Sequence, residues 1–215
     1  MVMKLKYIFP LICVGALSLS GCNDPKDASE SNFKIAAQQY LDTVYPVCYF
    51  ESNFPVKTDG YHFNNLPEIL HVMSEKGLLK EKELSRKHIE ASWSGKARDI
   101  VVNSYDLTDE GKKYYKTDAT KNISGKNIGG FCFGKATVSE VVNFTEPSDA
   151  MGQKISKVSF SYKVTDIPDW AKSSEITALD RRLKKDVDSE EKEIKLTNVF
   201  VLTNKGWVHG RLFGK

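Results

Sequence analysis

The pattern that most restricts the fold is a strict alternation of apolar and polar residues over 157–165. Two sets of side chains alternate along it: Val158, Phe160, Tyr162 and Val164, against Lys157, Ser159, Ser161 and Lys163. Successive side chains of a β-strand point to opposite faces, so this period of two predicts a strand with one face in the core and the other in water. Half-buried strands of this kind are typical of antiparallel sheets.

Neighbouring segments extend the same pattern. Residues 131–144 also alternate, and residues 146–152 have the length of a hairpin connection. Residues 195–203 and 207–213 predict a second hairpin around the turn sequence Asn204-Lys205-Gly206. We therefore expect four strands arranged as an antiparallel β-meander.

The N-terminal half has the spacing of helices instead. Residues 33–45 place apolar side chains three and four positions apart, and Pro46 ends that helix. A second helix is expected to begin at Leu66 and to end at Gly77. The charged stretch 81–91 is expected to be a third helix, with its few apolar residues facing inward.

The segments between these helices and the meander complete the expected architecture. Residues 100–107 predict a strand, Thr108 is expected to cap a short helix, and the polar, glycine-bearing stretch 116–130 is expected to be a loop. The predicted fold class is α+β, with a helical part at 33–120 packed with a β part at 128–215. Whether the two parts share one core stays open.

The N-terminus carries an export pattern. Lys4 and Lys6 precede an apolar run over 7–19, which is followed by small residues and Cys22. The sequence Leu19-Ser20-Gly21-Cys22 resembles the lipobox of bacterial lipoproteins. The resemblance implies a diacylglycerol on the Cys22 thiol, cleavage before Cys22 and acylation of the freed amine.

The same pattern has two alternative interpretations, a plain secretory signal with a chance cysteine and an uncut membrane helix. The apolar run of about 13 residues is shorter than the roughly 20 that span a bilayer, and Pro10 interrupts it. The expected layout is a signal peptide at 1–21, a flexible tether at 22–32 and a periplasmic domain at 33–215. The tether contains no large apolar residue and could reach roughly 35 Å.

The address within the envelope follows from the residue after the lipidated cysteine. Asn23 differs from the aspartate that resembles an inner-membrane retention signal, so we expect the outer membrane, facing the periplasm. Removing 1–21 lowers the formal charge from +3 to +1, since two lysines leave and no acid does. A near-neutral chain has no broad electrostatic footprint for nucleic acid, so no nucleic-acid partner is expected.

The cysteines sort by position. Cys13 leaves with the signal and Cys22 takes the lipid, so Cys48 and Cys132 remain. Because the periplasm is oxidising, we expect a Cys48–Cys132 disulfide. The competing interpretations are two buried thiols or a catalytic thiol.

Residues 66–115 resemble a winged-helix unit. The resemblance rests on Glu75-Lys76-Gly77-Leu78-Leu79, followed by Tyr105-Asp106-Leu107-Thr108-Asp109-Glu110-Gly111-Lys112. It implies a fold element but not DNA binding, because acids dilute the cations between the two motifs and an exported lipoprotein does not meet the chromosome. Three further motifs lie within residues 130–171: Gly130-Phe131-Cys132-Phe133-Gly134-Lys135, Phe144-Thr145-Glu146-Pro147 and Pro168-Asp169-Trp170-Ala171. Together they resemble small uncharacterised Gram-negative envelope proteins, which implies no activity.

Motifs for chemistry are not found in the sequence. There is no G-x-S-x-G, H-E-x-x-H or C-x-x-C pattern, and the four histidines show no metal-ligand spacing. We therefore predict no catalytic residue, no metal site and no cofactor. Trp93 and Trp170 are expected in loops as candidate partner contacts, the alternative being core or edge packing. The charged segment 173–194 is expected to be a solvated helix or a mobile loop, with a partner-binding arm as the third possibility.

These observations predict a membrane-anchored periplasmic lipoprotein that binds a protein or an envelope polymer, or has a structural role, and that is not an enzyme. The alternatives are an envelope hydrolase whose site follows no known motif and a toxin-immunity or inhibitor lipoprotein.

Overall fold

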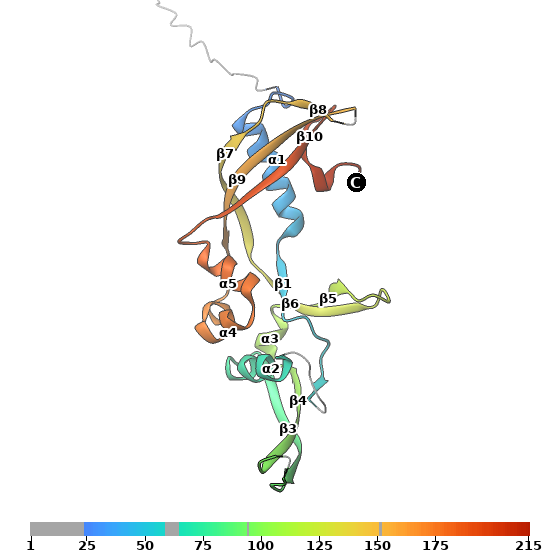
Figure 1. Cartoon of the computed structure of the whole chain (residues 1–215), viewed down its shortest axis with the longest axis vertical. Coiled ribbons are helices and arrows are strands. Elements are labelled where there is room, and N and C mark those ends of the chain that lie inside the picture. The colour runs from blue at the N-terminus through green and yellow to red at the C-terminus, as the bar shows by residue number, and fades with distance from the viewer. Residues whose placement is uncertain (1–23, 59–64, 94, 151) are drawn as a thin grey trace, which may run out of the picture.

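The alternating segment 157–165 lies within β9 (Gln153–Thr165), the longest strand of the computed structural model, which describes residues 24–58, 65–93, 95–150 and 152–215. β9 is central in an antiparallel sheet of order β11-β10-β9-β7, with β8 also paired to β9. The other strands of this sheet are β7 (Lys135–Phe144), β8 (Ser148–Ala150), β10 (Ile194–Thr203) and β11 (Gly206–His209). The predicted β-meander is confirmed (Figure 1).

Helix α1 (Glu30–Val44) packs on one face of this sheet (Figure 1). Ser29 caps the helix by accepting the backbone N–H of Asn32, and the helix ends before Pro46, as predicted. Its inward face is apolar at helical spacing: Phe33, Ala36, Ala37 and Leu41 are buried. The Phe33 ring lies 4.8 Å from the Trp207 ring of β11, so the helix and the meander share a core.

A second antiparallel sheet has the order β1-β6-β5. Its strands are β1 (Val47–Tyr49), β5 (Tyr115–Lys121) and β6 (Asn127–Phe133). The expected loop at 116–130 is therefore wrong, because backbone pairing with the buried strand β6 holds this polar segment as a strand. Residues 131–144 are divided between two sheets at Gly134, whose φ of +90° is a conformation that favours glycine.

The third sheet, of order β2-β4-β3, projects at the end of the molecule opposite the N-terminal helix (Figure 1). It contains β2 (Val56–Lys57), β3 (Leu79–Ile89) and β4 (Arg98–Leu107), and is flanked by α2 (Leu66–Glu75) and α3 (Asp109–Lys112). Gly77, at φ +77°, follows the end of α2, and Thr108 caps α3, both as predicted.

The helix expected at 81–91 is wrong, since these residues belong to β3 and pair with β4. Six of the eleven residues in this segment are charged and only three are apolar, so the apolar side chains do not define a helical face. Leu84, expected to face inward, is 44% exposed. The register with β4, which is set by tertiary structure, decides its conformation.

Between the two ends lie η1 (Asp169–Lys172), α4 (Ser174–Leu179) and α5 (Arg181–Asp188). Their buried residues Ile176 and Leu183 belong to the same apolar cluster as Phe33, Phe131 and Leu70. The helical and β parts therefore share one continuous core. The last expected strand is shorter than predicted, because residues 210–212 form the 3-10 helix η2 (Gly210–Leu212).

The segment expected as a free tether, 22–32, is held against the domain from Asp24 onward. Residues 24–27 form a turn, and α1 already begins at Glu30. Cys22 and the expected signal peptide at 1–21 lie outside the described residues. Of the helices in the part of the chain that the structure describes, none is long and apolar enough to cross a membrane.

Candidate functional site

Two concave regions lie on either side of helix α5. The first, which we call the carboxylate crevice, has a volume of about 480 Å³. It is lined by the end of α1, strand β1, part of β5 and the inner side of α5: Val44, Tyr45, Pro46, Val47, Cys48, Glu51, Ala119, Thr120, Tyr162, Arg182, Lys185 and Asp186.

Asp186 is the buried acid of the crevice. The side chain of Asp180 caps α5 by accepting the backbone N–H groups of Arg182 and Leu183. From that start, the helical spacing turns Leu183 and Asp186 toward the protein interior. Asp186 is only 6% exposed.

Two tyrosine hydroxyls donate hydrogen bonds to this carboxylate. The hydroxyls of Tyr49 and Tyr45 donate to Asp186 Oδ2 at 2.6 Å and 3.0 Å. Burial raises the pKa of the Asp186 carboxyl above its ordinary value, and the two hydrogen bonds offset only part of that rise. Burial and the neighbouring carboxylate also raise the pKa of both tyrosine hydroxyls.

The chemistry available here is that of one buried carboxyl with two hydroxyl donors. The cluster joins α5 to the segment that leaves α1, because its three members come from these two regions. Within the described ranges, no group of three His, Cys, Asp or Glu side chains could hold a metal ion. No local pattern distinguishes Asp186 from the other acids of this charged segment; its only signal in the sequence is its position three residues after Leu183 on a helix.

The second concave region, which we call the basic groove, lies between the outer side of α5 and the start of β10. Its volume is about 860 Å³, and its lining is Arg181, Lys184, Lys185, Asp188, Glu191, Lys192, Glu193, Ile194 and Lys195. Lys184 pairs with Asp188 at 2.7 Å, and Glu193 pairs with Lys163 at 3.5 Å. Among described residues, the other cations of the groove form no ion pair within 4 Å: Arg181, Lys185, Lys192 and Lys195.

The charged segment 173–194 is thus neither a wholly solvated helix nor a loop. It forms α4 and α5, with Ile176 and Leu183 in the core and its cations outside. The alternation of charge in the sequence concealed this division, because the buried positions include the acid Asp186.

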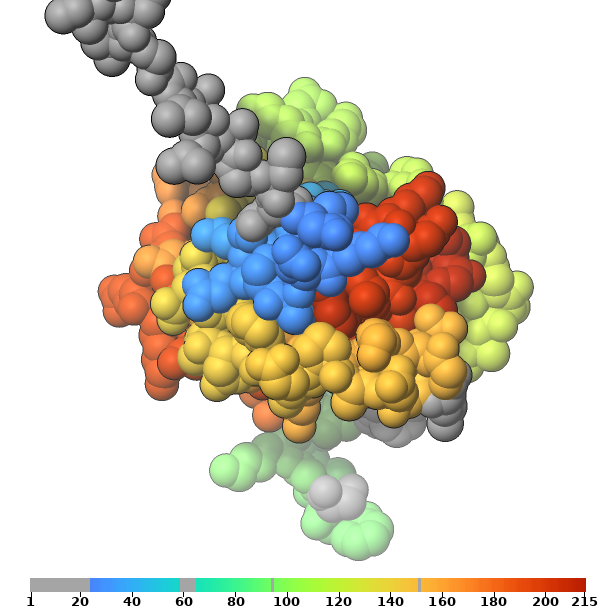
Figure 2. Space-filling view, turned by 90° about the horizontal axis from the view of Figure 1, so that it is seen from above, coloured from blue at the N-terminus to red at the C-terminus, as the bar shows by residue number. Residues whose placement is uncertain are grey.

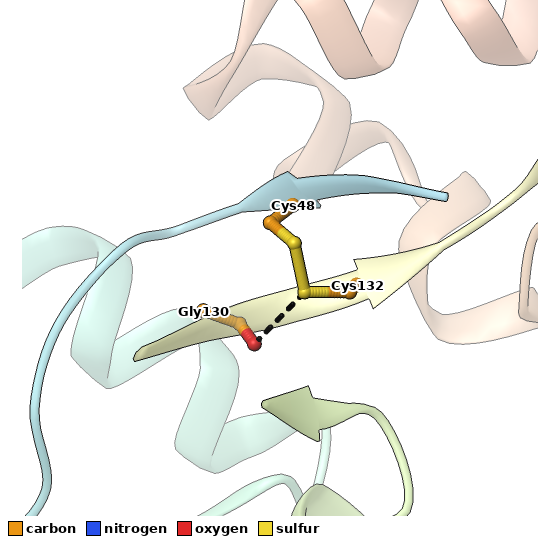
Figure 3. Close-up of a disulfide and its surroundings, with 3 residues drawn as sticks. All are labelled: Cys48, Gly130 and Cys132. Carbon is orange, nitrogen blue, oxygen red and sulfur yellow. Dashed lines mark hydrogen bonds between the residues drawn. A yellow bond between two sulfur atoms is a disulfide. The ribbon is translucent and has the colours of Figure 1, made fainter. Parts of the chain in front are cut away.

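The predicted disulfide is confirmed. Cys48 of β1 and Cys132 of β6 are bonded and occupy opposite positions in the antiparallel register (Figure 3). Cys48 also lines the carboxylate crevice, so the disulfide anchors one wall of it. Cys22, the predicted lipidation site, lies outside the described residues.

The two candidate contact tryptophans differ in environment. Trp170, in η1, packs edge-on against Phe133 at 5.3 Å and Tyr114 at 5.6 Å, which corresponds to the core-packing alternative rather than to a free loop. Trp93 follows β3 in the connection to β4 and is 100% exposed. The structure does not bring the two together.

His209 is the buried histidine of the meander, 2% exposed and stacked on Tyr40 with ring centroids 3.6 Å apart. Its Nδ1 accepts the backbone N–H of Arg211, so the neutral ring carries its proton on Nε2. Burial, aided by the Arg211 charge, lowers the pKa of His209 to about 4.

This pKa predicts an acid-sensitive contribution to stability. A histidine whose folded-state pKa lies below its ordinary value stabilises the fold at neutral pH and loses that contribution as the pH falls from 6.5 toward 4. We expect the unfolding free energy of the wild type, measured by urea denaturation, to fall over this range relative to that of His209→Phe. A constant difference between the two proteins at all pH values would contradict the prediction.

No family model, no curated protein and no solved structure matches this chain. The winged-helix and envelope-protein resemblances therefore stay predictions.

Proposed function

We propose that the protein is an envelope lipoprotein, anchored to a membrane through Cys22, that binds an envelope protein or polymer on its periplasmic side. One observation carries the proposal: the described chain begins at one end of an elongated body, and the hairpin of β3 and β4 projects from the other (Figure 1). A lipid on Cys22, two residues before Asp24, would thus hold the body by one end. The hairpin would be free for a partner.

The chemistry of the hairpin supports a contact role. Trp93 is fully exposed, so its large apolar ring system is left in contact with water. Lys87, Lys96 and Arg98 lie in the same hairpin and form no ion pair within 4 Å of their charged atoms among described residues. Tryptophan and arginine are enriched among the residues that dominate binding energy at interfaces. A partner with an apolar or sugar face and nearby negative charge fits this surface.

The anchor is tested by Cys22→Ala. We expect the wild type in the membrane fraction with an added acyl mass, and the variant released from the membrane without it. Fractionation and intact-mass spectrometry are the measurements. A variant that still partitions wholly with lipid would contradict the anchor.

The contact is tested by placing a photo-crosslinking residue at position 93 of the full chain in cells. Ile123, which is also fully exposed at a hairpin turn, provides the matched control position. We expect a discrete crosslinked product from position 93 and none from position 123. Equal labelling at the two positions would count against the hairpin as a binding surface.

A hydrolase is the second candidate function, favoured by the presence of Asp186 and Tyr45 in the lining of the carboxylate crevice, with the buried Tyr49 hydrogen-bonded to Asp186 behind it. The expected result for a hydrolase is that Asp186→Asn abolishes release of fragments from envelope polymer without unfolding the protein. Unchanged release, or none from the wild type, would exclude this crevice as the active site for that polymer.

A further inference from the structure

The chain just after the proposed lipidation site is fastened to the domain instead of hanging free. The backbone N–H of Asp27 donates to the Asp24 carbonyl at 2.9 Å, which closes a turn. The side-chain amide of Asn32 then donates to the carbonyls of Asp24 and Asp27, at 2.7 Å and 2.9 Å. Helix α1 thus holds the turn through one of its own first-turn residues.

Strand β11 holds the same turn from the other side. The indole N–H of Trp207 donates to the carbonyls of Lys26 and Asp27, at 3.1 Å each, and the indole itself is buried against Phe33. Gly206 has φ +118°, and a Cβ on it would lie 2.7 Å from the Pro25 carbonyl oxygen. The turn is therefore packed directly on the β10–β11 connection, and a glycine is needed for that approach.

This fastening limits how far the body can stand from an anchor. Asn23 is the one residue between Cys22 and Asp24, so the two Cα atoms are at most about 7 Å apart, since a residue spans about 3.5 Å when extended. A free tether over 22–32 would reach roughly 35 Å. The difference decides whether the domain can tumble beside the membrane.

We propose that the end of the body that carries this turn lies against the bilayer, and that the long axis leads the β3–β4 hairpin away from the membrane. The inference rests on the proposed lipidation of Cys22. The described parts of this anchor end include the turn at 24–27, the paired ends of β8 and β9, and the β10–β11 turn. Figure 2 looks onto it, with the start of α1 in blue between the strands in yellow-orange and red.

The surface of the anchor end suits a membrane contact that the lipid on Cys22 maintains, rather than one that the protein makes by inserting side chains into the bilayer. Its exposed residues have mixed charge: Lys26, Lys154 and Lys205 lie among Asp24, Asp27 and Asp149, and Lys154 pairs with Asp149 at 3.5 Å. The described residues of this end form neither the apolar face nor the excess of cations that draws a protein onto anionic lipid by itself. The contact should therefore form equally on neutral and anionic bilayers.

The test uses the full lipidated protein in vesicles that contain a lipid-borne quencher. A fluorophore is attached to a cysteine introduced by Lys205→Cys at the anchor end or by Lys96→Cys in the distal hairpin. Cys48 and Cys132 are not labelled because they are bonded to each other. We expect severalfold stronger quenching at position 205 than at position 96, on neutral and on anionic vesicles alike.

A variant with ten Gly and Ser residues inserted between Asn23 and Asp24 tests whether the short link to Cys22, and not the protein surface, keeps this end near the membrane. It leaves every described contact in place and should reduce quenching at position 205 severalfold. Equal quenching at the two positions of an acylated chain, or no change on insertion, would overturn the proposed orientation while the lipoprotein assignment stands. A chain without acyl mass would overturn both.

Discussion

Replacing Cys48 and Cys132 together by serine is expected to lower the free energy of unfolding by roughly 4 kcal/mol. The bond joins residues 84 apart in sequence, so it removes many conformations from the unfolded chain. Domains of this size are stable by about 5–15 kcal/mol, so the loss is a large fraction of the total. Urea denaturation of the purified domain, followed by circular dichroism, measures it.

The wild-type protein treated with a reductant provides the control for this prediction. It should unfold at the same urea concentration as the double variant, because both lack the same bond. A double variant within about 1 kcal/mol of the oxidised wild type would show that the unfolded chain is already restricted without the disulfide.

Asp186→Ala is expected to lower the free energy of unfolding by about 3 kcal/mol. The variant leaves the hydroxyls of Tyr45 and Tyr49 without their shared acceptor, and Tyr49 is fully buried. Asp186→Asn is the matched control, since its amide oxygen can accept both hydrogen bonds without a charge. We expect the asparagine variant to stay within about 1 kcal/mol of the wild type at pH 7.

The difference in unfolding free energy between the wild type and Asp186→Asn is expected to change with pH in one direction. Because burial raises the pKa of Asp186 above its ordinary 3.8, the folded state holds the proton more tightly than the unfolded state does. The resulting stabilisation is complete below pH 3.8 and is lost as the pH rises through the raised pKa. The wild type should therefore gain stability relative to Asp186→Asn on acidification; a difference that does not change with pH would contradict this.

The sequence predicted the fold correctly where a local pattern had only one structural interpretation. The alternation over 157–165 allowed only a half-buried strand, and the structure has it in β9. Pro46 cannot continue a helix, and α1 ends before it. Two cysteines, in a compartment expected to be oxidising, predicted the bond that β1 and β6 form.

Prediction failed where polar residues dominate and local preference is weak. Most of residues 81–91 and 116–130 are strands because each forms a hairpin with the next strand along the chain: β3 pairs with β4, and β5 pairs with β6. Such pairing depends on which segments meet in the fold, and a window of ten residues contains no record of it.

The candidate site was also beyond the reach of local patterns. Asp186, which lines the carboxylate crevice, is hydrogen-bonded to Tyr45 and Tyr49, which are 141 and 137 residues away in sequence. The fastened turn at 24–27 depends on Trp207, about 180 residues away. No sequence pattern marks these residues, and their roles come only from the residues that contact them in the folded structure.

The sequence by itself determined the antiparallel meander, the first helix and its end, and the disulfide pairing, because each depends on covalent chemistry or on a period that neighbouring residues already show. The anchor at Cys22 stays a prediction. Only the tertiary structure decided that the expected tether is fastened by Asn32 and Trp207, that a charged stretch is a projecting hairpin, and that Asp186 is buried. These features come from hydrogen bonds and burial between segments that local periodicity does not connect, and their energies exceed the weak local preferences of polar residues.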